Sequence, residues 1–205
     1  RDIVQQLLTF TRNRRQEQVV IDIRPIIKEG MKLLRSTIPT SIEFQISLPR
    51  ELPCVQVDAT QIHQILMNLC TNAAQAMEGG GTIEVYLDRV SLDEREVSFD
   101  KNLSSGDFVR LTVKDSGHGI QTEDLPRIFD PYFTRKEVGK GSGLGLSVVL
   151  GIVLSHGGGI KVHSEGDAGS IFEIYLPAQE KEQSVSPSEA SQDIPTGTEH
   201  ILFVD

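Results

Sequence analysis

The sequence predicts an α+β fold: a two-layer sandwich in which one mostly antiparallel sheet is covered by about three helices. Segments with apolar residues at helical spacing alternate along the chain with short runs in which apolar and polar residues alternate. Hydrophobic residues make up 38% of the 205 residues, which suffices for a core, and few are aromatic, so a core of Ile, Leu and Val is expected. The net charge of −9 argues against a nucleic-acid partner.

The first half of the chain is expected to contain three helices and three strands. The helices occupy 1–17, a segment opened by Pro25, and 59–77, where Asp58 is the N-cap and the glycines at 79–81 end the helix. The apolar face of the helix after Pro25 is expected to comprise Ile26, Ile27, Met31, Leu33 and Leu34. The strands are expected at 19–23, 42–48 and 54–58.

The second half is expected to supply four more strands and two more helices. The strands are 82–90, 108–114, 160–165 and 170–177, and the helices are a short one at 122–129 and one over roughly 143–156. Residues from 178 onward are rich in Ser, Pro, Glu and Gln, a linker composition. We therefore expect a domain over 18–178 preceded by the helix end at 1–17, and then a linker at 179–197 and a new strand within 198–205.

The cysteines and the lengths of the apolar runs indicate in which cellular compartment the protein is expected. Cys54 and Cys70 have neither CxxC nor Cys/His spacing, so they are expected to be reduced, partly buried thiols of a cytoplasmic protein. The longest apolar run, 144–154, is shorter than the roughly 20 residues of a membrane-spanning helix. A membrane anchor elsewhere in a longer parent protein stays open.

A stripe of neutral amides follows one face of the helix at 59–77. Its members are spaced 3, 4, 4 and 3 residues apart: Gln61, Gln64, Asn68, Asn72 and Gln75. An amide oxygen is a hard neutral ligand that suits Mg²⁺ held between protein and phosphates. An amide-rich solvent face explains the stripe equally well.

The stretch "VKDSGHGI" (113–120) places Asp115 at the end of a strand, followed by Gly117 and Gly119. A carboxylate there can accept a hydrogen bond from an exocyclic amine such as that of adenine, and the glycines let the backbone pass close to a flat ligand. An ordinary strand-to-loop turn is the alternative.

Two further stretches are consistent with an anionic ligand. "LPRIFDPYFTRK" (125–136) combines aromatic residues with Arg135 and Lys136, although a solvated basic turn fits as well. "GKGSGLGLSVVLGIVLSHGG" (139–158) has glycine at alternate positions and then opens a helix, whose N-terminus can bind an anion. It matches neither GxxxxGK[ST] nor GxGxxG, and a hinge before a core helix remains the alternative.

Taken together and in this order, these stretches resemble the catalytic ATP-binding domain of sensor histidine kinases, which has the GHKL or Bergerat fold. The segments similar to the N box, first glycine box, F box, second glycine box and closing hairpin are 68–77, 115–120, 128–136, 141–158 and 166–177. The resemblance covers roughly 18–178, and the forms "NAAQAM" and "DPYFTRK" are most similar to the nitrogen-sensor type.

The resemblance implies ATP and Mg²⁺ as cofactors and a role for each matching residue. Asn72 would be the principal Mg²⁺ ligand, supported by Asn68, and Asp115 would bind the adenine amine. The other implied nucleotide-binding residues are Gln75, Ala76, Gly117, Gly119, Ile120, Phe133, Thr134, Lys136, Gly141, Ser142, Gly143, Leu144, Gly145 and Leu146. Gln75 and Ala76 depart from the family, which often has a basic residue and an aromatic there. Ser116 stands in place of the more usual Asn or Thr, and Ser142 in place of Thr.

The flanking segments imply the rest of a hybrid histidine kinase. Residues 5–15 resemble the end of the second dimerisation helix, and 200–205, with Asp205, resemble the first strand of a receiver domain. The phosphoacceptor histidine is expected upstream, so no catalytic residue of the transfer is expected in this chain. Implied partners are ATP or ADP, the phosphoacceptor helix of the same or a partner subunit, a receiver domain or response regulator, and a second copy in the full-length homodimer.

Two other functions compete with the histidine kinase. ATP-hydrolysing GHKL relatives place a glutamate base where this chain has Asn68, a neutral amide that cannot accept a proton from water. A degenerate nucleotide-sensing module is the third hypothesis, because Gln75 and Ala76 depart from the family pattern.

Overall fold

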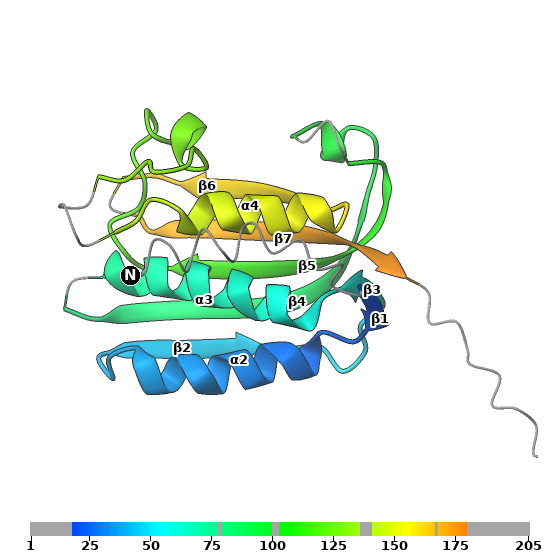
Figure 1. The fold of residues 1–205 in the computed structure, drawn as a ribbon, viewed down its shortest axis with the longest axis horizontal. Coiled ribbons are helices and arrows are strands. Elements are labelled where there is room, and N and C mark those ends of the chain that lie inside the picture. The colour runs from blue at the N-terminus through cyan, green and yellow to red at the C-terminus, as the bar shows by residue number, and fades with distance from the viewer. Residues whose placement is uncertain (1–17, 78, 100–102, 136–140, 167, 180–205) are drawn as a thin grey trace, which may run out of the picture.

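The computed structural model describes residues 18–77, 79–99, 103–135, 141–166 and 168–179 (Figure 1). Its helices are α2 (Arg24–Thr37), α3 (Ala59–Gln75) and α4 (Gly145–Ser155), with short 3-10 turns at Glu96–Phe99 and Leu125–Arg127. Its strands are β1 (Val19–Ile21), β2 (Ile42–Ser47), β3 (Cys54–Val57), β4 (Gly81–Leu92), β5 (Gly106–Asp115), β6 (Gly159–Ser164) and β7 (Ser170–Gln179).

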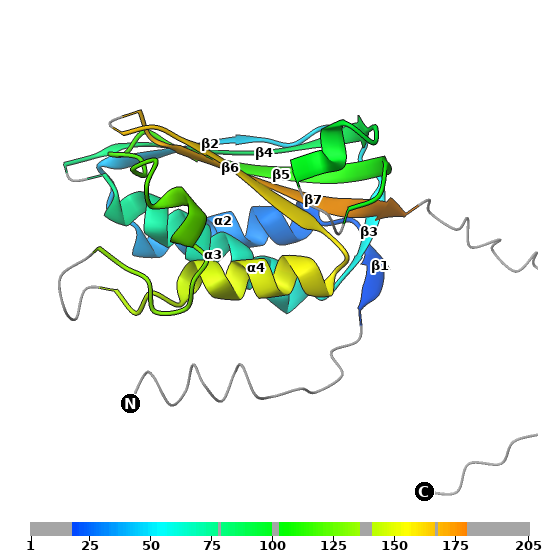
Figure 2. The ribbon, with the colours of Figure 1, turned by 90° about the horizontal axis from the view of Figure 1, so that it is seen from above.

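These strands form one seven-stranded sheet in the order β1-β3-β7-β5-β4-β2, with β6 also paired to β7. Every pairing is antiparallel except that of β2 with β4. All three described helices cover the same face of the sheet, as Figure 2 shows. The expected two-layer α+β sandwich with a mostly antiparallel sheet is therefore confirmed.

The core lies between the helices and the covered face of the sheet. Its largest fully buried side chains are aliphatic: Ile23, Ile27, Leu34, Ile62, Ile65, Leu66, Leu69, Ile83, Leu111, Ile174, Leu176 and Val55. α3 is the central helix, because it packs against both α2 and α4. Both cysteines are free and buried, as expected.

Local sequence signals account for the ends of the helices. The Asp58 carboxylate accepts hydrogen bonds from the backbone N–H groups of Thr60, at 2.7 Å, and Gln61, at 3.4 Å, which confirms it as the N-cap of α3. Pro25 lies in the first turn of α2. α4 ends at His156, and Gly157 follows with a φ of +64°, the left-handed conformation that commonly ends a helix.

The exposed large apolar residues include Ile46 and Leu33, and Leu33 was expected on the apolar face of its helix. Leu33 is 56% exposed, because the buried stripe of α2 is centred on Ile27 and Leu34 and Leu33 lies to one side of it. Ile46 is 47% exposed, because it lies on the edge strand β2 and lines an open cavity between the end of β2 and the start of α2.

Several element boundaries differ from the expectation. The helix expected at 122–129 is only a 3-10 turn over Leu125–Arg127, since it contains Pro126, which has no N–H to donate. The loop between β4 and β5 contains the 3-10 turn Glu96–Phe99, and it covers a small cluster on the other face of the sheet formed by Val97, Leu103, Phe108 and Tyr175.

Several domain predictions fall outside the described residues. These are the helix at 1–17, the linker beyond Gln179 and the strand at 198–205. β7 runs through Gln179, which pairs with Cys54 and is the first residue of the expected linker. In the part of the chain that the structure describes, no helix is long and apolar enough to cross a membrane.

Candidate functional site

The amide stripe of α3 meets the N-terminus of α4. A Cβ built on Gly145, the first residue of α4, would lie 3.4 Å from Oδ1 of Asn68 and 3.6 Å from Nδ2 of Asn72. Both asparagines are half-buried, whereas Gln75 at the last turn of α3 is exposed. Of the five amides in the stripe, Asn68 and Asn72 therefore lie beside the start of α4, and Gln75 is exposed.

Asp115 ends β5 with its carboxylate buried, and it is only 5% exposed. Burial raises the pKa of this carboxyl group, while hydrogen bonds from Gly117 and Ser170 and the nearby His118 act in the opposite direction. Its Oδ1 accepts a hydrogen bond of 2.8 Å from the backbone N–H of Gly117. Asp115 is thus a fixed, desolvated acceptor at the end of a central strand.

The loop after Asp115 packs on the end of α3. The backbone N–H of His118 donates to the carbonyl of Ala76 at 3.1 Å, and a Cβ on Gly117 would lie 2.7 Å from that same carbonyl oxygen. Glycine is required at 117 for this approach, since a Cβ would collide with backbone. Asp115 and the Asn68–Asn72 pair consequently lie along the same C-terminal half of α3.

The β6–β7 hairpin holds the same loop from the other side. The backbone N–H of Ile120 donates to Ser164 Oγ at 2.7 Å, and Ser164 Oγ lies 3.1 Å from Ser170 Oγ and 2.8 Å from the carbonyl oxygen of Gly169. Gly119 has a φ of +70° and lies against the carbonyl of Glu165. Sequence reasoning missed Ser164 and Ser170, because only the strand register places Ser170 beside Asp115 and Ser164 beside Ser170.

The aromatic segment is joined to the start of the second glycine-rich stretch. The backbone N–H of Tyr132 donates to the carbonyl of Gly143 at 2.9 Å, and both residues have a φ of +66°. Phe133 is half-buried against the core, and the guanidinium of Arg127 lies 4.7 Å from its ring centroid. A Cβ on Gly143 would collide with the Tyr132 backbone, so this junction requires glycine.

Of the cations expected in the aromatic segment, the structure describes Arg135, which is paired with carboxylates. Arg135 forms ion pairs with Asp124, through Nε at 2.5 Å, and with Glu123, through an Nη atom at 3.2 Å. Arg135 is therefore not an uncommitted phosphate ligand, which corrects that part of the interpretation. Lys136 lies outside the described residues.

The other predicted positions lie at or near the opening of α4. Gly141 and Ser142 are exposed, Leu144 and Leu146 are half-buried, and Thr134 is exposed. Ser142 Oγ accepts from the backbone N–H of Leu144 at 3.3 Å, but the N-cap of α4 has no side-chain hydrogen bond and its first turn has no acidic residue. Backbone N–H groups at the N-terminus of α4 are thus available to an anion.

The chemistry of the donors limits how a metal ion could bind. In the described ranges no group of three or more His, Cys, Asp or Glu residues could hold a metal ion. Any cation here would depend on the amide oxygens of Asn68 and Asn72, completed by ligand and water oxygens, which is how Mg²⁺ commonly binds with phosphates. This donor set fits Mg²⁺ bound together with a phosphate ligand.

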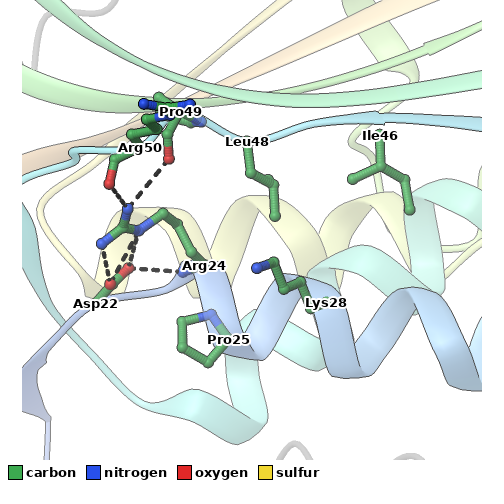
Figure 3. Close-up of a pocket in the computed structure, with 8 residues that line it drawn as sticks. All are labelled: Asp22, Arg24, Pro25, Lys28, Ile46, Leu48, Pro49 and Arg50. Carbon is green, nitrogen blue, oxygen red and sulfur yellow. Dashed lines mark hydrogen bonds and ion pairs between the residues drawn. The ribbon is translucent and has the colours of Figure 1, made fainter.

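A separate cavity lies at the opposite end of the sheet from this site. Figure 3 shows that it lies between the start of α2 and the end of β2. Its volume is about 750 Å³, and it is lined by Asp22, Arg24, Pro25, Lys28, Ile46, Leu48, Pro49 and Arg50. The guanidinium of Arg24 in this cavity donates hydrogen bonds to the Asp22 carboxylate, to the Pro49 carbonyl at 3.1 Å and to the Arg50 carbonyl. None of the residues predicted to bind the nucleotide lines this cavity. The candidate site is therefore located by its hydrogen-bonding groups and not by the cavity.

The fold and this site define the class of protein. The family model described as "Histidine kinase-, DNA gyrase B-, and HSP90-like ATPase" matches residues 57–180. That range contains the asparagine pair, Asp115 and both glycine-rich stretches. The chain belongs to this family, and the relatives that it resembles are sensor histidine kinases.

Individual relatives are sensor kinases. The chain is 36% identical over 192 residues to sensor kinase CckA of Brucella abortus, which covers 93% of this chain and 20% of that protein. It is 34% identical over 176 residues to sensor histidine kinase ZraS of Escherichia coli, covering 85% of this chain and 34% of that protein. The chain therefore spans a fifth to about a third of the length of these relatives.

Solved structures agree with the fold. The catalytic domain of histidine kinase ThkA matches with a TM-score of 0.63 at 30% identity, covering 79% of this chain and 96% of that one. ThkA in complex with response regulator protein TrrA matches with a TM-score of 0.65 at 28% identity, covering 87% of this chain and 47% of that one. The expected Bergerat-type fold is thus confirmed by histidine kinase catalytic domains.

Proposed function

We propose that this chain binds Mg²⁺-ATP along the C-terminal half of α3 and presents the γ-phosphoryl group to a histidine outside the chain. The observation that carries the proposal is the convergence of two contacts on that helix. Gly145 opens α4 beside Asn68 and Asn72, and the loop after Asp115 packs on Ala76. An adenine acceptor and an anion site are thereby held on one rigid element.

Each group would have a distinct task. Asp115 would accept from the adenine amine, with Gly117, Gly119 and Ile120 shaping the pocket around the ring. The N-terminus of α4 and the glycines before it would bind the phosphates. Gln75 is exposed and Ala76 contacts Gly117 through its backbone, so we assign neither a side-chain contact with the phosphates or the adenine.

Asn72, with Asn68 in support, would hold Mg²⁺ through its side-chain amide oxygen. When bound, the ion would neutralise phosphate charge, which is one of the two main requirements of phosphoryl transfer. The residues of this chain would supply the other requirement, which is the position of the nucleotide. Asn68 is neutral and cannot take a proton from water, so transfer to an imidazole is favoured over hydrolysis.

The parent protein is proposed to be a hybrid histidine kinase. Residues 1–17 would end its second dimerisation helix and 198–205 would begin a receiver domain, with the domain at 18–178 and a linker at 179–197 between them. Its partners would be the phosphoacceptor helix of the same or a partner subunit and a receiver domain or response regulator. The structure of the related ThkA in complex with response regulator protein TrrA supports the last of these. The domain would work in the cytoplasm, in a homodimeric parent with or without a membrane anchor.

Two experiments test this function. Isothermal titration with the non-hydrolysable analogue AMPPNP, with and without Mg²⁺, should show binding that Mg²⁺ strengthens. Incubation with γ-labelled ATP should leave this chain unlabelled but label a longer chain that includes the upstream helix. An absence of binding at millimolar nucleotide would favour the degenerate module. Steady ATP hydrolysis that is lost in Asn68→Ala would favour the ATPase.

A further inference from the structure

His156 is a buried imidazole that the proposed nucleotide chemistry does not use. It caps the C-terminus of α4 and is only 7% exposed. Its Nδ1 lies 2.8 Å from the carbonyl oxygen of Ile152, one turn earlier in the same helix. A carbonyl oxygen can only accept, so Nδ1 carries the proton and Nε2 is left as an acceptor.

The Nε2 atom of His156 accepts a hydrogen bond from the start of a different helix, α3. The backbone N–H of Asp58 donates to Nε2 at 3.1 Å, across 98 positions of sequence. Asp58 is also the N-cap of α3, and its own carbonyl oxygen accepts from Gln61 and Ile62 at 3.1 Å. One imidazole therefore joins the C-terminus of α4 to the N-terminus of α3.

The two helices are antiparallel and meet at both ends. At one end His156 contacts Asp58, and at the other Gly145 lies against Asn68 and Asn72. Gly145 and His156 are 11 residues apart (156 − 145), about 16 Å along a helix that rises about 1.5 Å per residue. Between these ends, α4 buries only the aliphatic side chains of Val149, Ile152 and Val153.

Apolar packing of this kind is non-directional, whereas a hydrogen bond is lost when its atoms separate by a fraction of an ångström. A slide of α4 by one residue would lengthen the contact between Asp58 and His156 beyond bonding distance. The same slide would move Gly145 relative to both amides. The hydrogen bond between the Asp58 N–H and His156 Nε2 consequently helps to specify the axial position of α4 on α3.

We propose that His156 is a positioning residue for the nucleotide site. Its bond to the Asp58 N–H fixes where the N-terminus of α4 lies relative to the Asn68–Asn72 pair. The inference rests on the proposed function, since it takes that junction to be where the phosphates bind. It adds to that function a residue remote from the junction that determines its geometry.

The test compares two replacements of His156 with a matched control. His156→Gln retains an acceptor at about the reach of Nε2, and His156→Met has similar volume without a nitrogen or oxygen acceptor. Val153→Ala removes buried volume at the same end of α4 and leaves the hydrogen bond in place. All variants are titrated with Mg²⁺-AMPPNP well below the lowest of their melting temperatures.

We expect His156→Met to bind AMPPNP roughly tenfold more weakly, because sub-ångström misplacement of binding groups is costly. His156→Gln and Val153→Ala should remain within about twofold of the unmodified chain. Equal affinities of His156→Met and Val153→Ala, or an equal loss in the Gln and Met variants, would overturn the proposal.

A measurement without nucleotide separates this proposal from the proposed function. In ¹H–¹⁵N NMR spectra of the nucleotide-free chain, the side-chain amide signals of Asn68 and Asn72 should shift in His156→Met and stay in place in Val153→Ala. If they shift and the unmodified chain binds no AMPPNP, the positioning role stands and the nucleotide function fails. If they do not shift, the positioning role fails whatever the nucleotide affinity.

Discussion

Replacement of Asp115 by Asn tests the adenine contact most directly. The two side chains have the same shape, and Asn can still accept at Oδ1 from the Gly117 N–H, now at 2.8 Å. What changes is the other end of the group, where an NH₂ donor replaces a charged acceptor. Facing the adenine amine, the variant would oppose a donor with a donor.

The expected loss follows from the burial of the carboxylate. Hydrogen bonds to charged groups contribute about 1.5–3 kcal/mol, which corresponds to roughly tenfold to hundredfold in affinity. Inosine triphosphate provides the internal control, because it has a carbonyl oxygen where ATP has the amine. The amide donor introduced by the substitution should pair with that oxygen, so Asp115→Asn should weaken ATP binding and strengthen ITP binding.

The assay is competition of ATP and of ITP against a fluorescent nucleotide, with melting temperatures measured in parallel. The ratio of the ATP and ITP affinities is informative, because a general loss of folding would lower both affinities alike. Disturbance of the hydrogen bonds between Asp115 and Ser170 would also lower both. A variant that loses ATP and ITP equally would refute the adenine contact. A variant that binds ATP as tightly as the unmodified chain would refute it as well.

Three further predictions concern the same helices. Gly117→Ala should weaken AMPPNP binding by about tenfold or more, because its Cβ would lie 2.7 Å from the Ala76 carbonyl oxygen. Gly151→Ala is the control, because its Cβ would meet nothing within 4 Å. It should leave binding unchanged and stabilise α4 by up to about 1 kcal/mol in urea unfolding. Asn72→Ala should lower affinity about tenfold with Mg²⁺ and much less in EDTA, and equal losses in both titrations would exclude a metal-linked role. Burial raises the pKa of the Cys70 thiol to about 12 from 9.0. Above pH 9 the unfolded chain therefore loses a proton that the folded chain keeps, so stability should fall by about 2 kcal/mol between pH 8 and about pH 10.5, and Cys70→Ala should lack this component in urea unfolding.

The sequence alone determined the fold class and the helix that carries the site. Apolar spacing located α2, α3 and α4 to within a few residues, and Asp58 was identified as an N-cap from its position before α3. These features are local, because helix periodicity and capping depend on residues within a few positions of one another. Four ordered motifs then sufficed to predict the family.

Only the tertiary structure decided which members of each motif act together. The amide stripe contained five residues at equivalent spacing, and the approach of α4 singles out Asn68 and Asn72 while Gln75 is exposed. By sequence, Arg135 was part of a local positive charge consistent with an anionic ligand, but it is paired with Asp124 and Glu123. Ion pairing of this kind depends on which side chains the fold brings within about 4 Å, and sequence spacing does not encode that proximity.

The serines beside Asp115 and the imidazole beside Asp58 show the same division. Ser170 reaches the carboxylate only through the register of β5 with β7, and His156 reaches Asp58 only because α4 runs antiparallel to α3. The sequence determined which residues could accept, donate or cap, since those are properties of each side chain. The packing of distant segments decided which of those groups meet, because hydrogen bonds between residues dozens of positions apart exist only in the folded chain.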